Sequence, residues 1–130
     1  MTALLEEVLP LDDERMVEAR VWSAFSARAM CDPAMAAIRR EADQGVRHLC
    51  EACLRALSQV GGVHLSRDTE VETERLWSLL DGMTMHILLA DPSRSPMKLA
   101  GRVLRSHLRD LGTAPASSPG HPMPPAAPGG

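Results

Sequence analysis

The chain has 130 residues, 45% of them hydrophobic but only 2% aromatic, and a formal net charge of −3. This length is enough for one domain with a hydrophobic core, and the acidic balance excludes a chain whose whole surface binds nucleic acid. Helix-favouring residues dominate, so an all-α fold is predicted. No apolar run could span a membrane and no signal peptide is recognisable. Three cysteines form no disulfide framework, so a cytoplasmic protein is predicted.

The first long helix is predicted to end near Met30. A short apolar segment, 3–9, precedes it, and Asp12 or Asp13 can serve as its N-cap. Apolar residues lie on two opposite sides of this helix, so we expect it to be buried on both. Arg28 projects from the larger apolar side, and a buried charge requires a partner.

Two further helix starts can be read from the sequence. Asp32 and Pro33 are suited to be the N-cap and first residue of a helix that continues to about residue 58. After a loop, Thr69 and Glu72 match a capping box, which predicts the start of the next long helix.

The last two helices carry the strongest functional signal. Residues 76–89 are apolar on more than one side, and such a helix needs cover from two directions. After a break, Ser95 and Pro96 are expected to cap and start a helix that ends near residue 111 and has one apolar side. We therefore predict that this hairpin packs against the hairpin of a second copy through Leu80, Met83, Ile87, Met97, Ala100, Gly101, Leu104, His107, Leu108 and Leu111.

The composition changes after the last predicted helix. Residues 112–130 are rich in Pro and Gly and offer almost nothing to bury, so this tail is predicted to be disordered. The predicted domain therefore comprises residues 1–111, folded as an antiparallel helical bundle.

Four segments in this order resemble a known family: RVWSAFSARA at 20–29, DPAM at 32–35, LWSLLDGM at 76–83 and DP at 91–92. They resemble the regulatory domain of TetR-family bacterial transcriptional regulators, and the BetI-like group in particular, over about residues 5–111. The resemblance implies an effector-binding domain that forms a homodimer, in which the last two helices of each subunit build a four-helix bundle. The family's DNA-binding head, which has a Tyr-Phe-rich recognition helix, has no counterpart here, so this chain itself is not expected to contact nucleic acid.

Polar and aromatic residues near the predicted helix contacts are the candidates for effector binding. Arg28 and Asp81 either orient a polar ligand beside an internal cavity or form a structural ion pair. The aromatic residues and a methionine either line the cavity or belong to the core. The candidates for effector binding are Trp22, Phe25, Arg28, Trp77, Asp81 and Met85.

Metal and catalytic sites are not predicted. Cys50 and Cys53 are neighbours on one helix, but His48 lies about 160° away around it, and zinc requires four good ligands. Ser106 and His107 are adjacent in sequence and point in different directions. We therefore expect neither a cofactor nor an enzyme.

The favoured interpretation is the regulatory domain of a TetR-like repressor that binds a small apolar or amphipathic effector and dimerises. It has no membrane contact and reaches operator DNA only through an absent N-terminal domain. The alternative is a ligand-free helical dimerisation module that pairs with full-length regulators.

Overall fold

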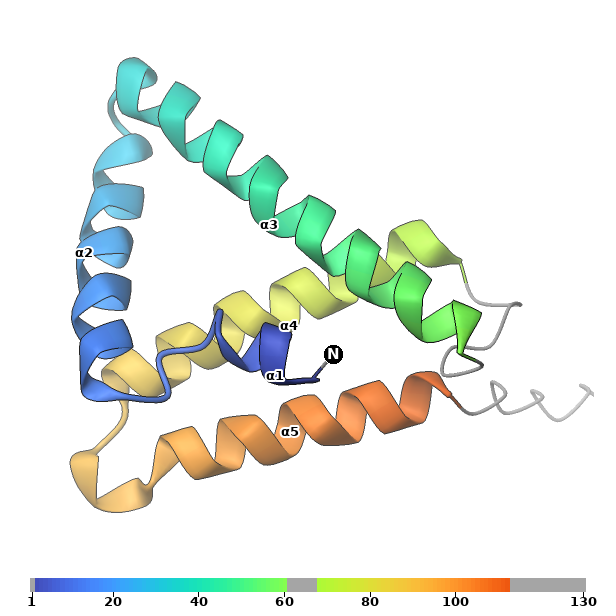
Figure 1. Cartoon of the computed structure of the whole chain (residues 1–130). Coiled ribbons are helices and arrows are strands. Elements are labelled where there is room, and N and C mark those ends of the chain that lie inside the picture. Colours follow the sequence, from blue (N-terminus) through green and yellow to red (C-terminus); the bar gives the residue numbers. More distant parts are fainter. Residues whose placement is uncertain (1, 61–67, 113–130) are drawn as a thin grey trace, which may run out of the picture.

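The computed structural model describes residues 2–60 and 68–112 (Figure 1). Within these ranges the fold is all-α, as predicted, with five α-helices, one short 3-10 turn and no strand. The elements are α1 (Thr2–Glu6), α2 (Asp13–Ala29), α3 (Pro33–Gln59), α4 (Thr69–Leu89), η1 (Pro92–Arg94) and α5 (Pro96–Leu111). The predicted disordered tail, apart from Gly112, lies outside the described residues.

Aspartate side chains define the starts of α2 and α3. Asp12 accepts a hydrogen bond from the backbone N–H of Arg15 at 2.9 Å, so it is the N-cap and Asp13 is the first helical residue. Asp32 accepts hydrogen bonds from the first turn of α3, and Pro33 follows it at the first position, as predicted. Both carboxylates satisfy backbone donors that the helix itself leaves unpaired.

The starts of α4 and α5 differ from the prediction. Asp68, and not Thr69, is the N-cap of α4, because its carboxylate accepts hydrogen bonds from two backbone N–H groups of the first turn. Glu72 is buried and pairs with Arg75 at 2.7 Å instead of closing a capping box. Ser95 has a φ of 35° and makes no side-chain cap, so α5 begins at its proline without one.

Helices α2, α3 and α4 form the three sides of a triangle, and α5 runs beside α4 (Figure 1). The short α1 packs against α5. The core lies where α1, α3, α4 and α5 meet, and its buried side chains are almost entirely aliphatic, as the composition predicts. The largest fully buried aliphatic side chains are Leu5, Leu9, Leu76, Leu80, Leu104 and Leu111.

Helix α2 is the exception to this burial. Its outer side leaves Val17 58% and Val21 66% exposed, so the prediction that this helix is buried on both sides is wrong. Because Arg28 lies on the same outer side, it is exposed and needs no buried counter-ion. Its position in the last turn of α2 favours a positive charge, since the C-terminal end of a helix carries partial negative charge.

Candidate functional site

A cavity of about 360 Å³ lies inside the helical triangle, between the N-terminal segment, α2 and α4. Its volume is within the range of small-molecule sites. Apolar and charged side chains both reach it, and the residues that line it are Glu7, Val8, Pro10, Arg15, Glu18, Ala19, Trp22, Val46, Leu80, Asp81 and Thr84. Two of the predicted effector-binding residues, Trp22 and Asp81, are among them.

Trp22, one of two stacked aromatic residues on α2, forms part of the wall of this cavity. The rings of Trp22 and Phe25 stack with their centroids 5.3 Å apart, and only the Trp22 side chain lines the cavity. The guanidinium of Arg39, from α3, lies over the ring of Trp22, 5.2 Å from its centroid, where the aromatic face attracts a cation. Nε of Arg39 donates a 2.7 Å hydrogen bond to the carboxylate of Asp43.

Asp81 projects toward this charged group from α4. Loss of water contact raises the pKa of the Asp81 carboxyl, the positive charge of Arg39 opposes the rise, and the negative charges of Asp43 and Glu74 add to it. Arg28 is exposed and does not line the cavity, and the described residues show no ion pair between Arg28 and Asp81. A role of Arg28 in effector binding stays a prediction.

The acidic residues of the N-terminal half were missed by the sequence analysis. Glu7 forms an ion pair with Arg15, which also bonds Asp12 at 2.9 Å. Glu18 lines the cavity and has no ion-pair partner within the described residues. The sequence pattern gave no signal that distinguished these acidic residues from ordinary surface charges.

Trp77 and Met85, the remaining candidates, lie outside the lining of the cavity. Trp77 is partly buried against the core. Met85 is half exposed, and its sulfur accepts a hydrogen bond from the hydroxyl of Ser23 at 3.9 Å, which links α4 to α2. Both side chains therefore contribute to helix packing around the cavity and not to its wall.

The predicted association residues are mostly part of the chain's own core. Eight of them are buried within a single chain: Leu80, Met83, Ile87, Ala100, Gly101, Leu104, Leu108 and Leu111. The most apolar stripe of each helix thus packs against α1, α3 and the other helix of the hairpin. Contact of these residues with a second copy stays a prediction. Met97 and His107 are partly buried, and Met97 packs against the core.

A second apolar surface remains on the outside of the hairpin. A hollow of about 310 Å³ lies between α4 and α5, and the predicted residues Met83, Ile87 and Ala100 are among its lining. Around them are exposed or partly exposed residues that we call the α4–α5 face: Ser78, Leu79, Gly82, His86, Pro96, Leu99 and Val103. Leu99 is 56% exposed and Val103 is 37% exposed, so this surface is apolar without being covered.

Two of the three cysteines have the properties of structural thiols. Cys50 and Cys53 are buried, and burial raises the pKa of both, that of Cys50 to about 11. His48 is exposed on another side of α3. Within residues 2–60 and 68–112, no group of three His, Cys, Asp or Glu side chains is arranged to hold a metal ion.

Comparisons with known proteins define the class. The C-terminal domain of BetI-type transcriptional repressors matches residues 1–113. The HTH-type transcriptional regulator PksA of Bacillus subtilis (strain 168) is 29% identical over 109 residues, which cover 83% of this chain and 51% of that protein. No solved structure gives a significant match. The chain is thus a C-terminal domain of the TetR class of transcriptional regulators.

More specifically, the chain belongs to the family of BetI-type transcriptional repressors and corresponds to their C-terminal domain. It spans about half the length of the curated relative that it matches. In the described part of the chain, no helix is long and apolar enough to cross a membrane.

Proposed function

We propose that this domain binds a small amphipathic effector in the cavity of the helical triangle and pairs with a second copy through the α4–α5 face, as part of a cytoplasmic transcriptional repressor. The observation that carries the proposal is the cavity of about 360 Å³, in which charged groups and an aromatic ring stand among apolar walls. Such a combination of apolar surface and few placed polar groups is typical of ligand sites.

The charges of the cavity favour an effector with a basic end. Glu18 has no ion pair within the described residues. The pKa of the Asp81 carboxyl is raised by loss of water contact, and the negative charges of Asp43 and Glu74 add to the rise. A cation beside these two groups would compensate their charges. The apolar part of the effector would lie against Val8, Ala19 and Leu80.

Helix α4 offers a route from the effector to the partner subunit. Leu80, Asp81 and Thr84 lie along the cavity, whereas Leu79 and His86 belong to the α4–α5 face. A ligand that favours one position of α4 would therefore also favour one arrangement of the paired hairpins. Any change of affinity for DNA would pass through a DNA-binding unit outside this chain.

A matched pair of probes tests the proposal. An alkyl trimethylammonium ion and its neutral isostere, in which carbon replaces nitrogen, have the same shape and differ in charge. We expect the cation to raise the melting temperature by several degrees near saturation, because a ligand at about 100 times its Kd adds about 2.7 kcal/mol of stability. The neutral isostere should give a much smaller shift.

Substitutions assign the effect to the cavity. Glu18→Gln and Asp81→Asn should each reduce the affinity for the cation at least about tenfold, whereas Glu14→Gln, an exposed acid on the same helix, serves as the control. Equal shifts from both probes, or no loss in either variant, would reject a cation site here.

A ligand-free dimerisation module is the second candidate function. The observation that favours it is the exposed apolar α4–α5 face, which does not depend on the cavity. Mixing the domain with a full-length relative and measuring heterodimers by native mass spectrometry would test it. Heterodimers in the absence of any cavity ligand would support this candidate.

A further inference from the structure

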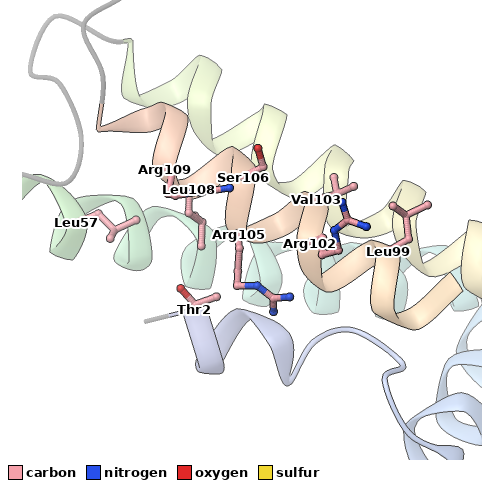
Figure 2. A pocket seen from close by; sticks show the side chains of 9 residues that line it. All are labelled: Thr2, Leu57, Leu99, Arg102, Val103, Arg105, Ser106, Leu108 and Arg109. Atoms are coloured by element: carbon pink, nitrogen blue, oxygen red, sulfur yellow. The ribbon is translucent and has the colours of Figure 1, made fainter. Parts of the chain in front are cut away.

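A groove of about 730 Å³ shares no residue with the effector cavity, whereas Leu99 and Val103 line both this groove and the α4–α5 face. It runs between α1, the C-terminal end of α3 and α5, and Figure 2 shows its lining side chains. Leu57, Leu99 and Val103 supply apolar surface. Three arginines of α5 also line the groove: Arg102, Arg105 and Arg109. The groove therefore combines apolar walls with a positively charged rim.

The arginines form a stripe along one side of α5. Positions 98, 102, 105 and 109 are spaced by four, three and four residues, so Lys98 and the three arginines lie on a common side of the helix. The groove thus concentrates positive charge in a chain whose net charge is −3.

Only part of this charge is neutralised. Arg105 donates a 2.7 Å hydrogen bond from Nη1 to Oε1 of Glu6, and Figure 2 shows its side chain reaching from α5 toward α1. Arg102 and Arg109 have no ion pair with any residue that the structure describes. By contrast, Arg47 on α3 lies within 4 Å of three carboxylates, those of Glu51, Glu70 and Glu74.

Helix α1 shows which chemistry this surface accepts. Its five residues include one acid: Leu5 is fully buried in the core, and Glu6 pairs with Arg105. A short, mostly apolar segment with one glutamate thus already pairs with an arginine in the middle of the basic stripe. Arg102 and Arg109 lie on either side of Arg105 along α5, seven positions apart, and each can form an ion pair of the same kind with an acidic residue.

We propose that this groove is the docking site for an amphipathic helix of a partner protein that carries two acidic residues seven positions apart. Two such residues lie on one side of a helix and about 10.5 Å apart along its axis, which equals the separation of Arg102 and Arg109 along α5. The apolar residues between them would pack on Leu57 and Leu99. A nucleic acid fits less well, because phosphates gain nothing from these leucines and the chain as a whole is acidic.

A designed peptide tests the site without knowledge of the natural partner. The probe is an 18-residue, fluorescein-labelled helical peptide with leucines on one side and two glutamates seven positions apart beside them. Its control has glutamine at both positions. We expect the intact 130-residue protein to bind the glutamate peptide at least tenfold more tightly than the glutamine peptide, measured by fluorescence anisotropy.

Paired variants assign the binding to the groove. Arg102→Gln combined with Arg109→Gln should weaken binding of the glutamate peptide at least tenfold, and circular dichroism should be unchanged because both side chains are exposed. The control is Arg20→Gln with Arg28→Gln, two exposed arginines of α2, which should change the affinity less than twofold.

Three outcomes would overturn the proposal. The first is failure of the glutamate peptide to bind, and the second is equal binding of both peptides or of the groove variant and the wild type. The third is binding of duplex DNA or of phosphatidylglycerol vesicles that the groove variant loses while the peptide does not bind, which would assign the stripe to phosphate groups.

Discussion

At the scale of single residues, the arginines in and beside the cavity are ion-paired, whereas two of the acids that line it, Glu18 and Asp81, are not, in the part of the chain that the structure describes. Arg15 is held by Glu7 and Asp12, and Arg39 is held by Asp43 over the ring of Trp22. Arg39 opposes the raised pKa of Asp81 only in part, and Glu18 has no ion-pair partner within the described residues. Because Asp81 has lost part of its contact with water, its ionised form costs free energy until it is protonated or meets a cation.

The raised pKa of Asp81 predicts how the stability of the protein changes with pH. Because its pKa is raised in the folded protein, mainly by loss of water contact, folding favours its protonated form. Its contribution to stability is therefore present below the unfolded pKa of about 3.9 and is lost as the pH rises through the folded pKa. We expect Asp81→Asn to raise the melting temperature at pH 7 and the gain to disappear near pH 4.

The opposite behaviour is expected of Asp91 and provides the control. Its pKa is lowered because the backbone N–H and the side chain of Ser93 donate hydrogen bonds to the carboxylate. Asp91→Asn should therefore lower the melting temperature at pH 7, and the difference should shrink as the pH falls through the lowered pKa. If both variants showed the same dependence on pH, the assignment for Asp81 would be wrong.

At the scale of helices, α5 shows how one amphipathic element supplies two surfaces. Leu104 is fully buried on its inner side, whereas Leu99 is 56% exposed on the outer side. Leu104→Ala should lower the free energy of unfolding by about 2 to 5 kcal/mol, since it leaves a cavity in a packed core. Leu99→Ala should change it by less than about 0.5 kcal/mol in the same urea titration.

Comparable losses for these two leucine variants would contradict the orientation of α5. The titrations should be run at low protein concentration, so that association does not add to the measured stability.

The start of α4 gives an independent test at the same scale. Asp68→Ala should cost about 1 kcal/mol, because two backbone donors of the first turn lose their acceptor. Thr69→Ala should cost clearly less, since Thr69 is the first helical residue and not the cap. If Thr69→Ala lowered the free energy of unfolding in urea more than Asp68→Ala does, Thr69 would be the cap, as the sequence predicted.

Helix positions were the most predictable part of the fold. Caps such as Asp12 and Asp32 act through bonds to residues two or three positions away, so a local pattern is sufficient to find them. The inward side of a helix depends on competition between distant elements. Helix α2 has apolar residues on both sides, and its periodicity alone does not determine which side faces the triangle.

At the scale of the whole molecule, the candidate site was only partly predictable for the same reason. Trp22 and Asp81 were found because aromatic and charged residues stand out on apolar helices. Arg39 was missed, because only the triangular arrangement brings α3 over the ring of Trp22. The association residues were placed on the most apolar stripes, which the chain buries within itself.

The central claim is that one chain completes its own core and still exposes a second apolar surface that pairs two copies. The residues to change are therefore Leu99 and Val103 on the α4–α5 face, and the matched control is Val21, an exposed apolar residue on α2. A charge at Leu99 or Val103 should disrupt pairing without loss of helical structure, because these side chains are not part of the core.

Sedimentation velocity of the wild type, Leu99→Glu with Val103→Glu, and Val21→Glu is the most direct measurement. The account predicts a wild type and a Val21→Glu variant of about twice the 14.1 kDa chain mass, and a helical double variant at the mass of one chain. A wild type that remains a single chain at high concentration, or a double variant that still sediments as a dimer, would contradict it.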